Sequence, residues 1–391
     1  SDDWADYPFD VNHDGATDII NIAQCDVPET TDTNPKFGVV QPHASAYWYQ
    51  NPGKAALAGD PKWVPHLMHQ DVRLEQHGFL DINKDGFPEI YGACKSCTPN
   101  ETKGYYQGDP ANPNNPWVYH PVTVHFTFPF GDLGWMHGEG GGDINGDGRA
   151  DLLERSGAWL QQPDGSFNQT DCTGKNVPAG CGHIPQNFYD GLPDGAGNKG
   201  ASHMYAVDMD MDGIADVVAA DWAHGEGLAW YKQDANGKFT KYYFMGGGSA
   251  ADKVKWGVNF SEPHALQVVD MDGDGRPDVV TGKMRFAHPL NQNDPDPLGV
   301  PYLYVFKNVA AKDPVSGGPI TLQPILVDPA VDPFPVSAAM APGAKPPALT
   351  TSTPDNGMGV GRQLAVGHVN TDGIMDICVG TKVGLAVFTG M

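Results

Sequence analysis

The sequence predicts an all-β fold, a β-propeller of six or seven four-stranded blades, and two repeated patterns support this prediction. The first is an acidic loop of the form Asp-x-Asp/Asn-x-Asp-Gly-x-x-Asp, which occurs six times along the 391 residues. The second is an aromatic strand, such as 228–233, that follows a loop after a shorter apolar strand. Four strands per unit, repeated along the whole chain, are typical of a propeller.

Each acidic loop offers oxygen ligands at alternate positions around a sharp glycine turn, which is the arrangement that calcium requires. The sixth copy is degenerate, because His368 replaces the first aspartate. The predicted ligands, loop by loop, are Asp10, Asn12, Asp14 and Asp18; Asp81, Asn83, Asp85 and Glu89; Asp143, Asn145, Asp147 and Asp151; Asp208, Asp210, Asp212 and Asp216; Asp270, Asp272, Asp274 and Asp278; and Asn370, Asp372 and Asp376. We therefore expect five or six calcium ions, one in each loop.

An EF-hand is the main alternative for these loops, because it begins with the same pattern. An EF-hand needs a bidentate glutamate at the twelfth position and a helix on each side. One copy has a glutamate there, Glu154, whereas every copy has an acid at the ninth position. Flanking segments such as 278–282 are short and β-branched, which favours strands over helices.

The loops divide one expected propeller domain, 1–391, into consecutive blades. The expected blades are 1–70, 71–128, 129–200, 201–250, 251–328 and 361–391. Residues 329–360 are rich in Pro, Ala and Gly, and we interpret them as a connector or a degenerate blade. The last blade ends on its third strand, so closure of the ring needs an outer strand from elsewhere.

Composition narrows the class of partner. The chain has 49 Gly and 34 Pro but only 18% charged residues, as expected of a turn-rich globular protein. A net charge of −24 argues against nucleic acid and anionic membranes, which require basic patches. No stretch approaches the ~20 apolar residues of a membrane span, and no signal peptide remains at Ser1, so we interpret the sequence as a mature form.

The six cysteines fall into three pairs by position: Cys172 with Cys181, Cys94 with Cys97, and Cys25 with Cys378. The first pair brackets a short loop, the second lies within one loop, and the third would be brought together by ring closure. We expect at least two disulfides, with a zinc site at the second pair as the alternative. Disulfides and calcium loops of this type favour a secreted protein, extracellular or periplasmic.

These loops and strands resemble the FG-GAP/VCBS-repeat family of calcium-binding β-propellers over essentially the whole chain. The segments Gly141–Asp151 and His264–Asp270 are also similar to the propeller domain of fungal aldos-2-ulose dehydratases and their bacterial relatives. The first resemblance implies that each calcium loop links the innermost strand of a blade to the next strand. The second implies a carbohydrate-active lyase or dehydratase.

Histidines gather at the strand ends opposite the acidic loops. Several precede a loop by four to six residues, one follows a second strand, and the string His-Gly-Glu-Gly occurs twice. Because the innermost strands of a propeller converge, we expect these side chains around the mouth of the central channel. The candidate catalytic residues are His77, His137, His203, His224, His264, Tyr205 and Glu139. His203 is offset by one residue in strand parity and needs a bulge to join the others.

Three functions are compatible with this histidine-rich face. In a lyase or dehydratase, one histidine abstracts a proton beside a carbonyl or carboxylate of a carbohydrate, while a second histidine, Tyr205 or a metal stabilises the developing charge. The alternative is a non-catalytic propeller for adhesion, glycan binding or assembly, which binds a carbohydrate, another small extracellular ligand or a protein partner. The third is a transition-metal or redox site that holds an ion such as Zn²⁺. Each histidine could instead pack between blades and bond a backbone carbonyl.

Overall fold

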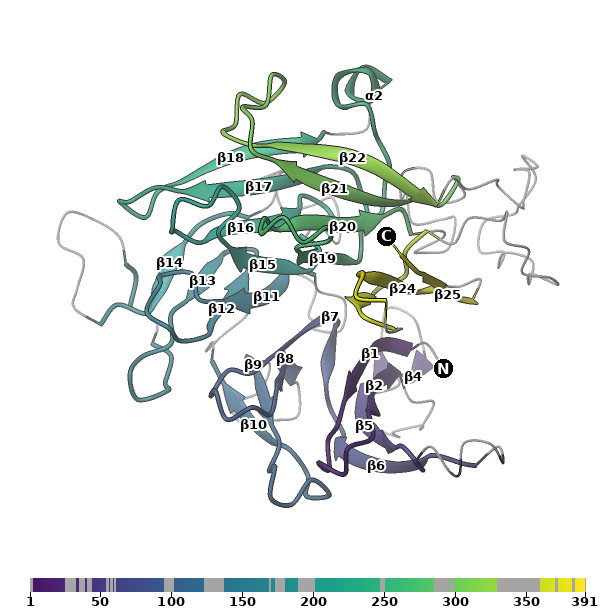
Figure 1. The fold of residues 1–391 in the computed structure, drawn as a ribbon. Helices are drawn as coiled ribbons and strands as arrows, with labels where there is room; N and C mark the ends of the chain where they lie inside the picture. Colours follow the sequence, from purple (N-terminus) through teal and green to yellow (C-terminus); the bar gives the residue numbers. More distant parts are fainter. Residues whose placement is uncertain are drawn as a thin grey trace. The chain divides into compact units, whose positions relative to one another are not determined.

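The computed structural model describes residues 3–24, 33–34, 39–40, 44–53, 56, 59, 61–94, 102–122, 137–168, 170–172, 180–188, 201–246, 250–284, 295, 299–328, 359–369, 372–381 and 384–390. These residues form β-strands and a short helix, α2 (Ala250–Trp256) (Figure 1). The chain divides into two compact units. One comprises Ser1–Met136 and Gln161–Gln169, and the other His137–Leu160 and Thr170–Met391. The predicted all-β class is confirmed.

The first unit contains two four-stranded antiparallel sheets, each formed by strands in chain order. Repeat one consists of β1 (Asp3–Phe9), β2 (Asp18–Gln24), β5 (Ala44–Gln50) and β6 (Val64–His69). Repeat two consists of β7 (Arg73–Leu80), β8 (Glu89–Cys94), β9 (Thr102–Gln107) and β10 (Val118–Pro121). The short strands β3 (Thr33–Asn34) and β4 (Val39–Val40) pair separately. Buried side chains of both repeats, such as Trp48 and Ile90, share one core.

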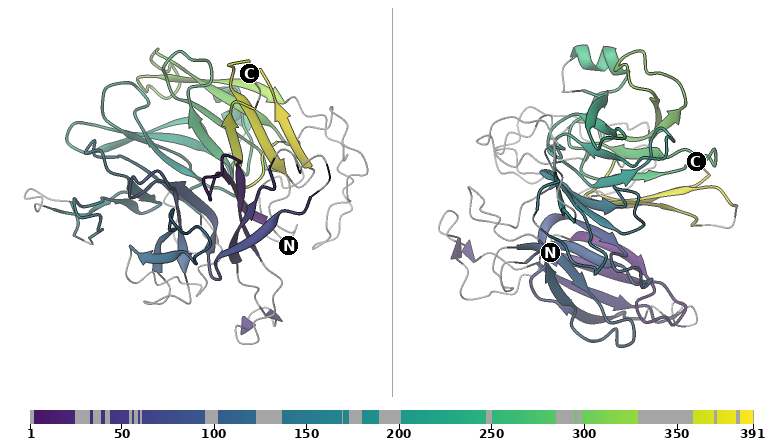
Figure 2. Two further views of the ribbon diagram at one scale, coloured as in Figure 1. Left: turned by 60° about the horizontal axis from the view of Figure 1, so that its bottom comes forward. Right: turned by 90° about the vertical axis from the view of Figure 1, so that its left-hand side faces the viewer.

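The second unit contains four further repeats (Figures 1 and 2). Repeat three consists of β11 (Glu139–Gly142), β12 (Asp151–Glu154), β13 (Gly157–Trp159) and β14 (His183–Pro185). Repeat four consists of β15 (Met204–Val207), β16 (Asp216–Ala220), β17 (Leu228–Gln233) and β18 (Phe239–Met245). Repeat five consists of β19 (Leu266–Val269), β20 (Asp278–Gly282), β21 (Leu303–Val309) and β22 (Thr321–Asp328). Repeat six has three described strands, β23 (Leu364–Gly367), β24 (Asp376–Thr381) and β25 (Gly384–Phe388), as the sequence predicted.

The first strands of successive repeats are neighbours in the second unit. β11 pairs in parallel with β15, through Gly140 beside Met204 and Gly141 beside Tyr205. β15 in turn contacts β19, and β19 contacts β23. Innermost strands of a propeller are arranged in this way. The propeller-like arrangement of these repeats agrees with the sequence, whereas the count of six or seven blades stays a prediction.

The alternating direction of side chains along the second strand of a repeat explains how the repeats stack. In β16, Val217 belongs to the core shared with repeat three, and Val218 to the core shared with repeat five. In β20, Val279 and Val280 divide in the same way between the cores shared with repeats four and six. Successive side chains of a strand point to opposite faces, so a continuous apolar run buries both faces. Repeats four and five are therefore each held between their neighbours by hydrophobic burial.

Each described acidic loop lies between the first and second strands of its repeat, as predicted. The loop glycine adopts a left-handed conformation, for example φ +86° at Gly15 and +87° at Gly213. Other residues adopt this conformation only at a cost, which explains the glycine at the sixth position. Asn370, a predicted ligand of the sixth loop, lies outside the described residues.

The predicted cysteine pairs are confirmed in part. Cys172 and Cys181 form a disulfide. Cys94 is also disulfide-bonded, which contradicts the alternative of a zinc site at this cysteine. Cys378 is a free thiol, so the predicted third pair is not formed. Cys25, Cys97 and residues 329–358 of the expected connector lie outside the described residues. No helix in the described part of the chain is long and apolar enough to cross a membrane.

Candidate functional site

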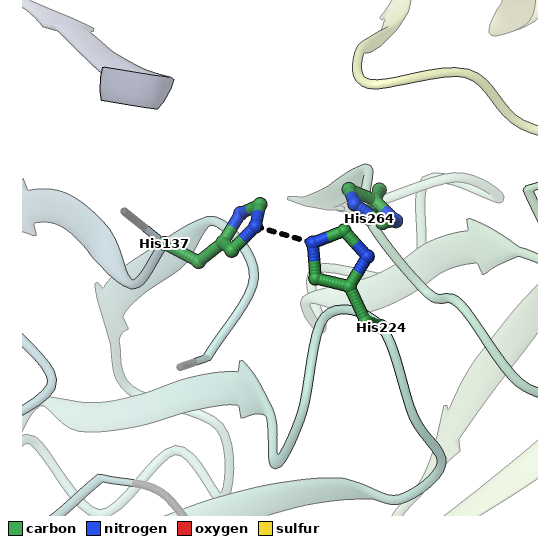
Figure 3. A group of neighbouring side chains, drawn as sticks. All are labelled: His137, His224 and His264. Carbon is green, nitrogen blue, oxygen red and sulfur yellow. Dashed lines mark hydrogen bonds between the residues drawn. The ribbon is translucent and has the colours of Figure 1, made fainter. Parts of the chain in front are cut away.

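Three buried histidines of the second unit converge on one point (Figure 3). His137 precedes β11, His224 lies in the loop after β16, and His264 precedes β19. Their exposed fractions are 3%, 1% and 0%. One ring nitrogen from each residue lies within 4.8 Å of the other two. We call this group the histidine centre.

The rings of the histidine centre meet edge to face. Ring centroids are 4.5 Å apart for His137 and His224, 4.3 Å for His224 and His264, and 5.2 Å for His137 and His264. The Nε2 atoms of His137 and His224 share a hydrogen bond of 2.6 Å. One ring therefore donates and the other accepts, so at least one imidazole is neutral. Neutral imidazole is the form that binds metals.

The two His-Gly-Glu-Gly strings hold their histidines on turns that need glycine. Gly138 has φ +92°, in the left-handed region. Gly225 lies so close to Trp222 that a Cβ atom added there would be 1.8 Å from the indole ring. The repeated string therefore has a local structural cause at both histidines.

A third loop is fixed against the loop of His224 by backbone hydrogen bonds. The N–H of Glu262 donates to the carbonyl of Gly225 over 2.6 Å. The carbonyl of Glu262 accepts from the N–H groups of His264 at 2.9 Å and Met284 at 3.0 Å. Glu262 itself has φ +61°, a costly conformation for a residue with a side chain. Such strain next to a polar cluster is typical of a functional loop.

Two other predicted residues of repeat four, His203 and Tyr205, are not part of the histidine centre. Burial, and then the charge of nearby His137, lower the pKa of His203 to about 4, so this imidazole is neutral at pH 7. Its absence from the group agrees with the offset in strand parity. The Tyr205 hydroxyl donates to the carbonyl of Leu266 over 3.0 Å and so links β15 to β19. Burial raises the pKa of this phenol above its ordinary value.

The last two predicted catalytic residues have different surroundings. Glu139 is fully buried on β11, directly opposite the equally buried Glu154 of β12. His77 is buried on β7 in the first compact unit. The structure therefore brings together three of the five predicted histidines.

The acidic loops share one hydrogen-bonding scheme around the first aspartate. In repeat one, Asp10 accepts from the backbone N–H groups of Asp14 at 3.1 Å and Gly15 at 2.9 Å. The same pair of bonds recurs at Asp81, Asp143, Asp208 and Asp270. These bonds curl each of the five loops around its first aspartate.

The acid at the ninth position is buried and accepts hydrogen bonds from two separate backbone segments, a role that the sequence pattern did not reveal. Asp216 accepts from the N–H of Met209 at 3.2 Å and from the N–H of Gln233, at the end of β17, at 2.8 Å. Both bonds recur at Asp18, Asp278 and Asp376. Burial raises the pKa of Asp216 to about 7, and that of Glu89 likewise to about 7.

Two loops already bring three carboxylates together. Oxygens of Asp208, Asp210 and Asp216 lie within 4.8 Å of one another, and the equivalent oxygens of repeat five do the same. Calcium binds oxygens at 2.3–2.6 Å, so two ligands of one ion are at most about 5 Å apart. The carboxylates therefore fit a calcium ion.

Side-chain amides join successive repeats, and this role was also missed from the sequence. The Nε2 of Gln233 donates to the carbonyl of Ile144, in the loop of the preceding repeat, over 3.0 Å. Equivalent bonds join Gln161 to Ile82 and Asn308 to Met209. The recurrence of Asn or Gln at or just beyond the end of the third strand is the signal that could have predicted them.

Fold and loops together define a β-repeat protein with acidic loops between its inner strands. Residues 208–281 match the family model described as "FG-GAP-like repeat". This match confirms that the chain carries repeats of the FG-GAP type, from the acidic loop of repeat four into β20. A comparison with curated proteins found no match. Among solved structures, the V. cholerae biofilm matrix protein Bap1 is 14% identical with a TM-score of 0.30; the match covers 76% of this chain and 36% of that chain.

Proposed function

We propose that the histidine centre binds a transition metal ion such as zinc. The observation that carries this proposal is the convergence of three buried imidazoles whose ring nitrogens lie within 4.8 Å of one another. Three histidines with an open fourth position form the ligand set of a catalytic zinc site. Imidazole also suits copper, iron and nickel.

The present spacing of the rings needs little adjustment for this role. Zinc binds histidine nitrogens at 2.0–2.1 Å, which in a tetrahedral site separates two nitrogens by about 3.3 Å. The Nε2 atoms of His137 and His224 are now 2.6 Å apart. Binding would therefore replace their mutual hydrogen bond and open the pair by less than about 1 Å.

Buried carboxylates near the centre would offset the charge of a dication. Glu139 and Glu262 are both fully buried, and each lies two residues along the chain from a ligating histidine. Three neutral imidazoles alone would leave a divalent ion uncompensated in a medium of low dielectric constant, which is costly. Acidic residues at these positions lower that cost.

For the reaction, we propose a β-elimination of the lyase or dehydratase type on a carbohydrate that carries a carbonyl or carboxylate. A bound zinc-class ion would polarise such a group. His203 is neutral near pH 7, and we assign to it the proton from the adjacent carbon; as the C=C bond forms, the leaving group departs from the next carbon and is protonated by water. The disulfide between Cys172 and Cys181 supports a location outside the cytosol.

We also propose that the acidic loops bind calcium and that these ions stabilise the repeats. The shared hydrogen-bonding scheme supports this role, because it curls the loops alike, and in repeats four and five three carboxylates converge. Binding to the folded state alone would raise the stability of the protein.

Metal analysis of the purified protein tests the histidine centre. We expect about one equivalent of a transition metal, or uptake of cobalt with visible absorption typical of tetrahedral coordination. His224→Ala and His264→Ala should abolish this uptake without changing the calcium content, whereas His183→Ala, outside the centre, should leave both unchanged. Wild-type protein that takes up no zinc or cobalt would overturn the proposal and favour the non-catalytic glycan-binding or assembly alternative.

The reaction is tested separately on ketosugars and uronides. Metal-loaded wild-type protein should form an unsaturated product that absorbs in the ultraviolet, and His203→Gln should lower the rate while keeping the metal. A loaded centre with no turnover of either substrate class would leave a metal site and remove the lyase.

A further inference from the structure

The acidic loops fall into two classes that differ at the third position. Repeats four and five have an aspartate there, Asp210 and Asp272. The other four loops have an asparagine, namely Asn12, Asn83, Asn145 and Asn370. Each of these two loops therefore carries one carboxylate more than the loops of repeats one to three, and two more than the degenerate sixth loop.

A lysine reaches both of the more acidic loops. The Lys232 ammonium forms ion pairs with Asp210 and with Asp212, the latter at 2.5 Å. The Lys307 ammonium pairs with Asp272 and lies 3.7 Å from Asp274. Each lysine thus contacts the carboxylates at the third and fifth positions of its own loop.

Strand register shows that the two lysines occupy equivalent sites. Lys232 follows Tyr231, which pairs with Val217 directly after the ninth-position acid. Lys307 has the same place in β21. By the same register, the equivalent residues of the other repeats carry no charge: Gln50, Gln107, Leu160 and Thr389. Lysine is therefore present where the third position is aspartate and absent where it is asparagine.

With every carboxylate counted as ionised, the lysine brings the formal charge of the loop in repeat four to that of the loop in repeat one. The loop of repeat four has four carboxylates, at positions 208, 210, 212 and 216, and one ammonium from Lys232, which leaves a net charge of −3. The loop of repeat one has three carboxylates, at positions 10, 14 and 18, and also carries −3. The affinity of a calcium loop depends on the charge of its ligands. An added carboxylate that is balanced by a tethered cation therefore has a purpose other than tighter binding.

We infer that Lys232 and Lys307 are built-in counter-cations that hold the loops of repeats four and five together without calcium and compete with calcium for the third-position carboxylate. This inference rests on the calcium binding proposed above. It divides the loops into two kinds. Repeats four and five keep their loop structure when calcium is low, whereas the loop of repeat one, with Asn12 and Gln50 at the equivalent positions, depends on the ion. Calcium must displace the lysine ammonium from the third-position carboxylate or share that carboxylate with it. These two loops therefore bind calcium less tightly than four carboxylates without a lysine would.

Calcium titration of lysine variants tests this role. In Lys232→Gln, which copies Gln50 and Gln107, the loop charge becomes −4, and we expect calcium to bind that loop about tenfold more tightly. The same variant should melt at a lower temperature in EDTA and gain more from calcium than the wild type does. Lys307→Gln should behave alike and provides a second, independent variant. Lys238→Gln, an exposed lysine on the same hairpin, is the matched control and should change neither quantity.

A compensated variant separates charge balance from loss of a side chain. Asp210→Asn with Lys232→Gln recreates the asparagine type of loop, and its calcium affinity should return to within about threefold of the wild type. Asp210→Asn alone leaves the lysine unbalanced and should weaken calcium binding by about tenfold. If the wild type binds calcium but both Lys→Gln variants bind it no more tightly, the counter-cation role is wrong. If the wild type binds no calcium at all, the calcium proposal itself fails, and this inference fails with it.

Discussion

His137 and His224 meet through their Nε2 atoms at 2.6 Å, although 87 residues separate them in the chain. One belongs to repeat three and the other to repeat four, and each begins a copy of His-Gly-Glu-Gly. β11 pairs in parallel with β15, and β16 runs antiparallel to β15, so the segment before β11 and the loop after β16 lie at the same end of these strands. The histidine centre is therefore a product of repetition: one short string, used twice, supplies two of its three imidazoles.

The close approach of Gly225 to Trp222 makes the loop of His224 sensitive to a single methyl group. Gly225→Ala would place a Cβ atom 1.8 Å from the indole ring, so the loop must shift. We expect a loss of about 1–3 kcal/mol of stability and a loss of metal uptake at the histidine centre. Gly367→Ala is the control, because a Cβ there has no atom within 4 Å. Equal melting curves and equal metal content for the two variants would contradict this prediction.

Acid should destabilise the metal-free protein through His203. Burial, together with nearby His137, lowers the pKa of His203 to about 4 in the folded state, from an ordinary value of 6.5. A lowered pKa contributes stability that is fully present above pH 6.5 and is lost as the pH falls toward 4, because the unfolded chain binds the proton more readily. The contribution is about 3 kcal/mol. Urea unfolding in EDTA between pH 7 and 4.5 should show a shallower fall for His203→Gln than for wild type. Parallel curves would show that this imidazole is not responsible.

The repeat architecture could be predicted from the sequence because its signals are local. An acidic loop such as 143–151 and the apolar strand after it are contiguous, so one continuous pattern predicts both the turn and the strand. The position of two histidines at the strand ends opposite the loops could also be predicted, because His137 and His264 each precede a loop by six residues and share a strand face.

The remainder of the site depends on contacts between distant segments. The left-handed turn at Glu262, which sets the backbone beside His264, results from its hydrogen bonds with Gly225 and Met284 and has no sequence signature. The same holds for Tyr205, whose hydroxyl is engaged by the Leu266 carbonyl 61 residues away. A pattern names residues of suitable chemistry, but only tertiary packing decides which of them meet.

Loss of the Gln233 side-chain amide should weaken the packing of repeat three against repeat four. The Nε2 of Gln233 donates to the carbonyls of Ile144 at 3.0 Å and Ala215 at 2.7 Å, and its side chain is 5% exposed. Gln233→Ala leaves the buried Ile144 carbonyl and the half-buried Ala215 carbonyl without this donor, so we expect a loss of about 1–3 kcal/mol in urea unfolding. Asn236→Ala, at the exposed tip of the same hairpin, should change stability by less than about 0.5 kcal/mol. A cost at Gln233 no larger than that of the control would show that this amide contributes nothing.

Calcium binding to repeat four should release a proton. Burial raises the pKa of Asp216 to about 7, above its ordinary value of 3.8, so part of this carboxyl is protonated at neutral pH in the metal-free protein. The raised pKa contributes stability that is fully present below pH 4 and is lost as the pH rises through 7, where the buried carboxylate ionises. Calcium needs the ionised form, and its binding therefore displaces the proton.

The affinity of this loop should consequently weaken by up to about tenfold for each pH unit below 7. Calorimetric titration at pH 6 in two buffers of different ionisation enthalpy measures the protons released per calcium bound. Glu89, whose pKa burial also raises to about 7, adds its own proton in repeat two. Asp216→Asn should therefore lower the total release without abolishing it. The same proton count in wild type and variant would mean that Asp216 is already ionised before calcium arrives, and that its two backbone N–H donors, Met209 and Gln233, outweigh the effect of burial.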